Sequence, residues 1–282
     1  MNTVHLSLCC PDTEKSCFAC CPPIRPADYE HIDYRNIIKR TLLENTKQFD
    51  NTSNNINPIT GFSCWALGYL DSEFKQIGCL LHPAKNKGKD LRYRIDYGEK
   101  CRRETCPEEK LFSELELNDQ YFWLHLADGL DSFSYSSHKI NPLFSILGWG
   151  KKILQLIAVE EQGKIIDRAS FFSKYCFLST NLPSRGVAYL INQLAISDKT
   201  DFLKTDSFKV EFENFAVNIS KILNTEYGSI HGGSHVHLLD IEAAFSDFLR
   251  ISAGISKIQI EDAARIRDRV DKELYLLKEK LP

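Results

Sequence analysis

Ten cysteines are the residues of this sequence best suited to chemistry, and nine of them fall within the first 106 residues. Cys17, Cys20 and Cys21 form a C-x-x-C pair with an adjacent third thiol. Two residues between thiols allow both sulfurs to bind one metal ion from a tight turn, a spacing found in zinc and iron–sulfur sites. The pattern predicts a metal centre in the N-terminal part of the chain.

The other N-terminal cysteines can complete such a centre. A tetrahedral site needs four ligands and a pair of sites needs eight, and the clustered thiols with one histidine can supply either. Adjacent thiols do not easily bind one small ion together, so one of each adjacent pair is expected to bind a second ion or to pack in the core. Zinc and an iron–sulfur cluster both accept four thiolates, so the spacing leaves the metal open. The candidate ligands are Cys9, Cys10, Cys17, Cys20, Cys21, Cys64, Cys79, Cys101, Cys106 and His82.

The order and flanking residues of these cysteines resemble the YkgJ-type cysteine-cluster family, described as a zinc- or iron-chelating domain. The resemblance covers about residues 9–107 and lies in Cys17-x-x-Cys20-Cys21, Cys64-Trp65-Ala66-Leu67, Cys79-Leu80-Leu81-His82-Pro83, Cys101-Arg102-Arg103 and the final Cys106. His82-Pro83 stands where the family has Arg-Pro, and the gap before Cys101 is long, which leaves the ligand set open. The resemblance implies a metal-binding module. It also allows an iron–sulfur enzyme, because some relatives are described as flagellin lysine N-methylases.

A basic segment runs between the last cysteines. Over residues 85–103, eight cations oppose three acids, a local net charge of 8 − 3 = +5. A solvated basic face would offset the negative charge of metal-bound thiolates. Tyr93 and Tyr97 could instead stack on bases, which leaves a zinc-dependent RNA-binding protein as an alternative. The whole chain has 35 Lys and Arg against 38 Asp and Glu, a net charge of −3, which does not favour nucleic acid as a partner. The cations are Lys85, Lys87, Lys89, Arg92, Arg94, Lys100, Arg102 and Arg103.

The N-terminus and the apolar stretches bear on location. The opening MNTVHLSLCC lacks the basic region and the long apolar core of a signal peptide. The longest apolar stretch, residues 142–159, is interrupted by Lys151 and Lys152, so no membrane span is predicted. We therefore expect a cytoplasmic protein, in which thiols stay reduced or bind metal rather than form disulfides.

Two kinds of pattern divide the chain. Residues 1–107 are rich in prolines and glycines and indicate loops and short elements, apart from one helix over residues 28–46. Residues 108–282 show helical spacing. We predict a mainly α protein, with an irregular, cysteine-rich metal-binding module (residues 1–107) packed on a helical region (residues 108–282). Helices are expected over residues 111–126, 143–161, 167–178, 184–194, 210–224, 240–251 and 261–281.

Two further patterns lie near the C-terminus. The last predicted helix carries an apolar stripe, which indicates packing on the rest of the domain or, as the alternative, a helical protein partner. The stripe is Ile266, Val270, Leu274, Leu277 and Leu281. Upstream, His231, His235 and His237 precede Asp240 and Glu242, and this group is either a second metal site or a polar loop with ordinary hydrogen bonds.

The sequence as a whole predicts a metal-binding protein with a thiolate cluster for zinc or an iron–sulfur centre. The metal would serve folding and a redox or metal-handling role. No phosphate-binding loop and no complete nucleophile motif is present, so no substrate or catalytic residue is predicted.

Overall fold

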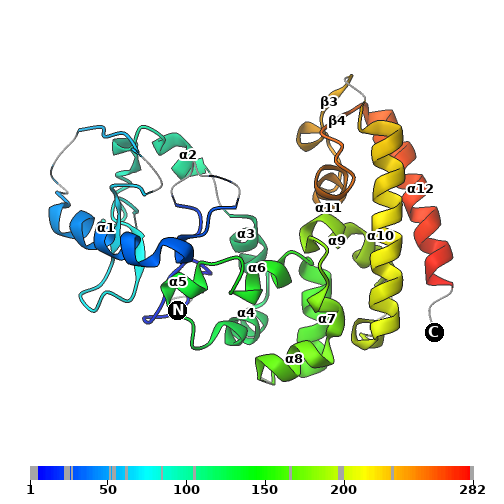
Figure 1. The fold of residues 1–282 in the computed structure, drawn as a ribbon, viewed down its shortest axis with the longest axis horizontal. Coiled ribbons are helices and arrows are strands. Elements are labelled where there is room, and N and C mark those ends of the chain that lie inside the picture. Colours follow the sequence, from blue (N-terminus) through cyan, green and yellow to red (C-terminus); the bar gives the residue numbers. More distant parts are fainter. Residues whose placement is uncertain are drawn as a thin grey trace. The chain divides into compact units, whose positions relative to one another are not determined.

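The computed structural model of the chain is drawn in Figure 1. It is mainly helical and its strands are short, which confirms the predicted mainly α class. Among the described helices, none is both long and apolar enough to cross a bilayer. The structure describes residues 6–21, 26, 28–50, 52, 55–60, 63–83, 85–103, 106–164, 167–195, 200–229 and 232–279.

The chain divides into two compact units. The first comprises Met1–Gln120 and Ala127–Phe144, and the second comprises Tyr121–Leu126 and Ser145–Pro282. Nine of the ten cysteines therefore belong to the first unit. This unit extends past the boundary expected at residue 107, because residues of its later helices hydrogen-bond to the N-terminal segment.

Short elements make up the first unit. Strand β1 (Leu67–Tyr69) pairs antiparallel with β2 (Ile77–Cys79), and this register sets Leu67 opposite Cys79. Helix α1 packs against β1, and the helix predicted over residues 28–46 begins as a 3-10 turn at His31. The helical elements are η1 (His31–Tyr34), α1 (Arg35–Gln48), η2 (Arg92–Arg94), α2 (Gly98–Arg103), α3 (Pro107–Ser113) and α5 (Ser132–Tyr135), while α4 (Leu117–Leu124), η3 (His125–Ala127) and α6 (Pro142–Leu147) include residues of both units.

An apolar core in the first unit borders the cysteines. Cys64 belongs to it, and Cys21 and Cys79 pack against it from the side. Full burial of each large apolar side chain stabilises the unit by roughly 1.5–3 kcal/mol. The core also contains Phe18, Ile38, Leu42, Ala66, Leu67, Tyr69, Ile77, Leu81, Leu91, Ile95 and Phe133.

Helix α9 (Ser184–Leu194) is the most buried helix of the second unit that the structure describes, and it packs against α11, η7 and α12. The Tyr189 hydroxyl on α9 donates a hydrogen bond to Asp271 of α12 (2.5 Å). Helices α10 and α12 run side by side in Figure 1 and are joined by the ion pair of Arg269 with Glu226 (2.6 Å). The other elements are α7 (Lys151–Glu161), α8 (Arg168–Lys174), η4 (Cys176–Ser179), η5 (Asp201–Lys204), α10 (Asp206–Tyr227), β3 (Ser234–His235), η6 (Val236–Leu238), α11 (Ala243–Asp247), η7 (Phe248–Ser252, a π-helix), β4 (Lys257–Ile258) and α12 (Ile260–Lys278).

The apolar stripe of the last helix is buried within the second unit. Ile266, Val270, Leu274 and Leu277 on α12 are all inaccessible to solvent or nearly so, whereas Leu281 lies outside the described residues. The stripe therefore packs α12 on the rest of the second unit. A protein partner at α12 would have to contact another face of the helix.

Four predicted helices differ from the structure in their continuity or limits. The helix expected over residues 167–178 ends at Lys174 as α8, and the 3-10 helix η4 follows after Tyr175. The helix expected over residues 111–126 is two helices, because the Gln120 amide donates to the carbonyls of Phe112 and Leu115 (both 3.0 Å) and ends α3. The helix expected over residues 143–161 breaks at Gly150, whose φ of +89° favours glycine. The helix expected over residues 240–251 begins only at residue 243 and widens into the π-helix η7.

Candidate metal centre

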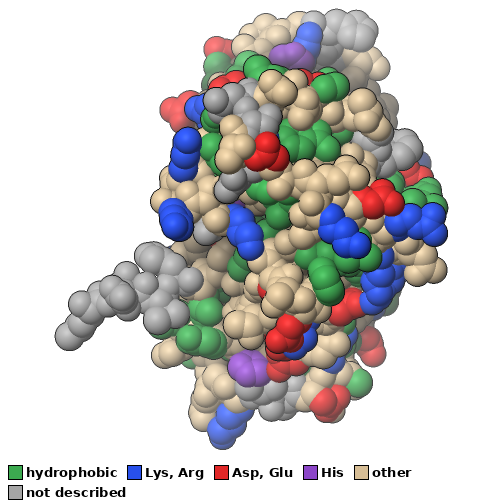
Figure 2. Space-filling model, turned by 90° about the vertical axis from the view of Figure 1, so that its left-hand side faces the viewer, with side chains coloured by type: hydrophobic (Ala, Val, Ile, Leu, Met, Phe, Trp, Pro, Cys, Tyr) green, Lys and Arg blue, Asp and Glu red, His purple; other side chains and the backbone are tan. Residues whose placement is uncertain are grey.

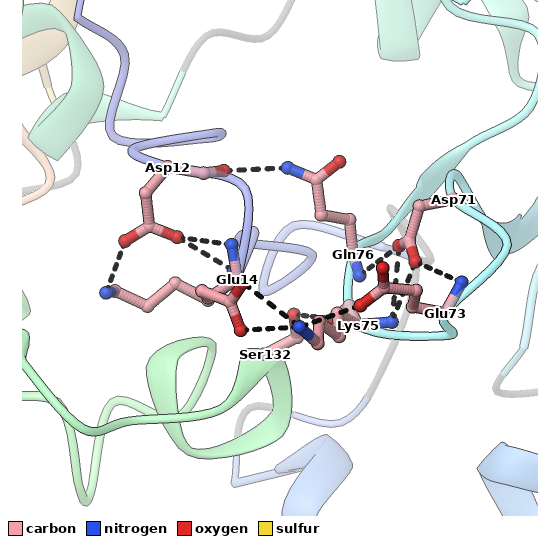
Figure 3. Close-up of polar contacts among 8 residues, drawn as sticks. Asp12, Glu14, Asp71, Glu73, Lys75, Gln76 and Ser132 are labelled. Atoms are coloured by element: carbon pink, nitrogen blue, oxygen red, sulfur yellow. Dashed lines mark hydrogen bonds and ion pairs between the residues drawn. The ribbon is translucent and has the colours of Figure 1, made fainter.

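Hydrogen bonds fasten the N-terminal cysteine segment to the loop between β1 and β2, and Figure 3 shows them. The Asp71 carboxylate accepts the backbone N–H of Gln76 (2.5 Å) and so closes the loop. The Gln76 side-chain amide donates to the carbonyl of Asp12 (2.7 Å), and Lys75 forms an ion pair with Glu14 (2.8 Å). Two segments about sixty residues apart in sequence are thereby held side by side.

Ser16 makes the most buried of these connections, with 1% of its surface exposed. Its hydroxyl accepts the backbone N–H of Ile77 (2.6 Å) and donates to the carbonyl of the same residue (2.8 Å). Its own backbone N–H donates to the Ser132 hydroxyl on α5 (3.0 Å). One residue thus joins the N-terminal segment, strand β2 and helix α5.

Replacement of Ser16 by alanine is expected to destabilise the first unit. The change leaves the N–H and carbonyl of Ile77 buried without this partner, which costs about 1–3 kcal/mol of unfolding free energy. Hydrogen–deuterium exchange would detect this as faster exchange of β2, with α9 in the second unit as the internal reference. Ser113→Ala, on an exposed turn of α3, is the matched control. Equal exchange of β2 in the two variants would contradict the assigned role of Ser16.

Three cysteines lie in turns in which a backbone N–H approaches the sulfur. At Cys17, Cys64 and Cys79 burial raises the pKa of the thiol, and a hydrogen bond to the sulfur from the backbone N–H two residues further on offsets part of that rise. Donation to sulfur stabilises the thiolate, which is the form that binds metal. The donors are Ala19, Ala66 (3.4 Å from the Cys64 sulfur) and Leu81.

Four segments contribute Cys21, Cys64, Cys79 and Cys101, which we call the first thiol group. Burial, with a smaller contribution from the Cys101 thiol, raises the pKa of Cys64 to about 12 and that of Cys79 to about 11. The pKa of Cys21 is raised by a hydrogen bond with the Cys20 thiol, by burial and by the neighbouring thiols of this group. These four thiols are therefore linked by pairwise electrostatic repulsion.

Local structure positions the first thiol group. Cys79 ends β2, and Cys64 lies three residues before β1, in a turn closed by donation from Leu67 N–H to the Cys64 carbonyl (2.9 Å). The Asn45 amide of α1 donates to the carbonyls of both Cys64 (3.1 Å) and Leu67 (2.8 Å). Cys101 lies on α2. The hairpin, α1 and α2 therefore hold three of the four thiols.

Cys9, Cys10, Cys17 and Cys106 form the second thiol group. Burial, with a smaller contribution from the Glu109 carboxylate, raises the pKa of Cys9 to about 12. Burial is also the main cause of the raised pKa of Cys17, with a contribution from Cys9, and of Cys106, with a contribution from Cys17. The backbone N–H of Cys17 donates to the Cys9 carbonyl (2.8 Å), which folds the N-terminal segment back on itself.

Glu109 attaches the second thiol group to helix α3. Its carboxylate accepts hydrogen bonds from the Leu8 N–H (2.7 Å) and the Ser7 hydroxyl (3.0 Å). Its backbone N–H donates to the sulfur of Cys106 (3.3 Å), which caps the helix at its N-terminus. Sequence reasoning missed Glu109, although an acidic residue three positions after an N-cap is a recognisable helix-start pattern.

Cys20 and Cys21 connect the two groups. The Cys20 thiol raises the pKa of Cys9 and Cys17 in the second group, and also that of Cys79 in the first. Cys21 interacts with the first group. Cys20 thus interacts with thiols of both groups, whereas Cys21 interacts with Cys20 and with the first group.

Arg92 brings positive charge to the first thiol group. Its guanidinium donates to the carbonyl of Cys101 (2.9 Å) and offsets part of the rise that burial causes in the pKa of Cys79. Asp90 fixes its position through hydrogen bonds to Nε (3.0 Å) and Nη2 (2.9 Å), and these hold the pKa of Asp90 at about 2. The basic segment was predicted to offset the charge of the thiolates, and Arg92 supplies such a charge beside Cys79.

Histidines contribute less than cysteines to these groups. His82 is exposed and follows Cys79 in a turn, with its backbone N–H donating to the Cys79 carbonyl (3.1 Å), and burial and Arg92 lower its pKa. In the second unit the rings of His235 and His237 lie 5.4 Å apart, while His231 is outside the described residues. Glu242 forms an ion pair with Arg267 (2.7 Å).

All ten cysteines are free thiols, and each is among the described residues. Within the described part of the chain, no three His, Cys, Asp or Glu side chains converge closely enough to hold an ion as they stand. The two thiol groups are neighbourhoods of sulfurs rather than formed coordination shells. No known protein family, curated protein or solved structure matches the chain.

Proposed function

We propose that this protein binds metal through thiolates of its first unit, at two centres. The first thiol group (Cys21, Cys64, Cys79 and Cys101) would supply four ligands to one centre. Cys9, Cys17, Cys20 and Cys106 would supply four to the other, with Cys10 beside them. Four thiolates satisfy the coordination of zinc and also of an iron–sulfur cluster.

The observation that carries this proposal is that eight thiols from separate segments interact as two groups, with Cys20 interacting with both. Burial and mutual repulsion raise the pKa of these thiols, so ionising several of them together is costly without a cation. A divalent metal ion removes that cost by binding the thiolates directly. The backbone N–H donors at Cys17, Cys64 and Cys79 further favour the thiolate.

The resemblance to the YkgJ-type family supports the same proposal. Its motifs include the thiols of both groups except Cys9 and Cys10, and it adds zinc and iron as the candidate metals. The metal would stabilise a unit whose elements are short and would serve redox chemistry or metal handling. A cytoplasmic location belongs to the proposal, because thiols remain reduced there.

Measurement of the metal content tests this function. Protein purified without air should contain about two zinc ions per chain, or iron with acid-labile sulfide. Visible absorption that bleaches on reduction identifies iron–sulfur clusters, and it would favour an iron–sulfur enzyme of the N-methylase type over a zinc protein. Elemental analysis that finds neither zinc nor iron in stoichiometric amounts would contradict the proposal.

The basic segment supports RNA binding less than the thiol groups support metal binding. Arg94 is buried and packs over the rings of Phe49 and Trp65 (5.8 and 5.7 Å), and Arg102 pairs with Glu99 (2.8 Å). On the face shown in Figure 2, Lys and Arg side chains are interspersed with acidic and hydrophobic ones. RNA affinity that falls steeply with added salt would be needed to revive this alternative.

A further inference from the structure

A pocket of about 400 Å³ lies in the second unit between α9, α10 and the π-helix η7. Its volume is near the lower end of the range for ligand sites, about 300–1,000 Å³. Apolar side chains line much of it: Val187 of α9, Ala216 and Val217 of α10, and Ile251 of η7. Val217 and Ile251 are large apolar side chains that remain 54% and 43% exposed.

Two hydroxyls of this pocket lack hydrogen-bond partners. Ser220 of α10 is 9% exposed, and neither its Oγ nor the buried Oγ of Ser252 has a partner in the part of the chain that the structure describes. A helical serine commonly bonds to the carbonyl four residues earlier, and these two do not. A buried hydroxyl without a partner costs about 1–3 kcal/mol, which a ligand acceptor would relieve.

The backbone at the pocket is unusual as well. Ile251 and Ser252 belong to η7, a π-helix, and its wider turn presents both residues to α9 and α10. Gly186 of α9 faces them, because a Cβ there would lie 2.6 Å from the Ser252 hydroxyl. Single π-helical turns inside helices are frequently found at functional sites.

Lys221 adds a cation at the edge of the pocket. It is exposed and forms no ion pair with any described residue. Val217, Ser220, Lys221 and Asn224 follow one another at helical spacing, so one face of α10 combines an apolar, a hydroxyl, a cationic and an amide group. An anion with an apolar body matches this combination.

We propose that this pocket binds a small organic carboxylate. Its apolar body would cover Val187, Val217 and Ile251, and its carboxylate would accept hydrogen bonds from Ser220 and Ser252 and pair with Lys221. The site lies in the second unit and is independent of the metal proposed for the first.

Ligand titration of the full-length protein tests this inference. Phenylacetate and 4-methylpentanoate serve as probes, and phenylacetamide is the neutral analogue of matched shape. At least one carboxylate should bind saturably with a Kd on the order of 1 mM, measured by ligand-observed NMR, and the amide should bind about tenfold more weakly.

Variants locate the site. Ser220→Ala and Lys221→Gln should each weaken carboxylate binding about fivefold to tenfold, and Lys272→Gln on the exposed face of α12 should not. Lys221 is exposed, so its replacement leaves the core of the unit intact. The inference is overturned if neither carboxylate saturates, if the amide binds equally well, or if Lys221→Gln binds as the unaltered protein does.

Discussion

Metal removal is expected to unfold the first unit while the helices of the second remain formed. Between the short elements of the first unit the chain is held by the thiol groups, by the contacts of Figure 3 and by one apolar core. Structural zinc binding to four protein ligands contributes about 10–16 kcal/mol in small domains, which exceeds the whole stability of many of them. A strong chelator under reducing conditions should therefore raise hydrogen exchange across residues 6–21 and 63–83.

The second unit supplies the control for that experiment. Helices α9 and α10 contain no cysteine, and most of their buried side chains are apolar, so their exchange should be unchanged after chelation. The metal would have no structural role if chelator altered neither the exchange of residues 63–83 nor the far-UV circular dichroism and protease sensitivity of the protein.

Serine replacements should empty the two centres separately. Serine supplies no thiolate at neutral pH, so Cys64→Ser with Cys79→Ser should remove the metal of the first centre and leave that of the second. Cys9→Ser with Cys106→Ser should do the reverse. Each pair is expected to halve the metal content, and all four together should abolish it, as measured by elemental analysis of purified protein.

Two further variants make this test specific. Cys176→Ser, in the second unit, should keep the full metal content, because that thiol belongs to neither group. Cys101→Ser changes a half-buried thiol on α2 and keeps the core cysteine Cys64, so it separates loss of a ligand from loss of the fold. Complete metal loss in both paired variants would contradict two centres and indicate one shared site.

Much of the helical fold could be predicted from spacing alone. The predicted limits of α9 agree with the structure, and α12 buries the predicted stripe, because apolar residues at helical spacing are sufficient to define a buried face. The breaks could not be predicted. They depend on the Gln120 amide reaching back to α3 and on Gly150 adopting a positive φ, and both are tertiary choices that leave the apolar period unchanged.

The candidate site was predictable by residue type and less so by grouping. Nine clustered thiols identify the chemistry, and C-x-x-C spacing suggests which turns favour ligation. Which thiols become neighbours depends on the β1–β2 register and on Ser16, Glu109 and Arg92, residues whose types carry no metal-binding signal of their own. The pocket beside η7 depends on a π-helical turn that no sequence period indicated.

X-ray absorption spectroscopy at the edge of the bound metal tests the central claim most directly. Thiolate ligation predicts a first shell of about four sulfur atoms at about 2.3 Å from the metal. A first shell made only of nitrogen and oxygen atoms, at about 2.0–2.2 Å, would contradict the claim that the cysteines of the first unit hold the metal.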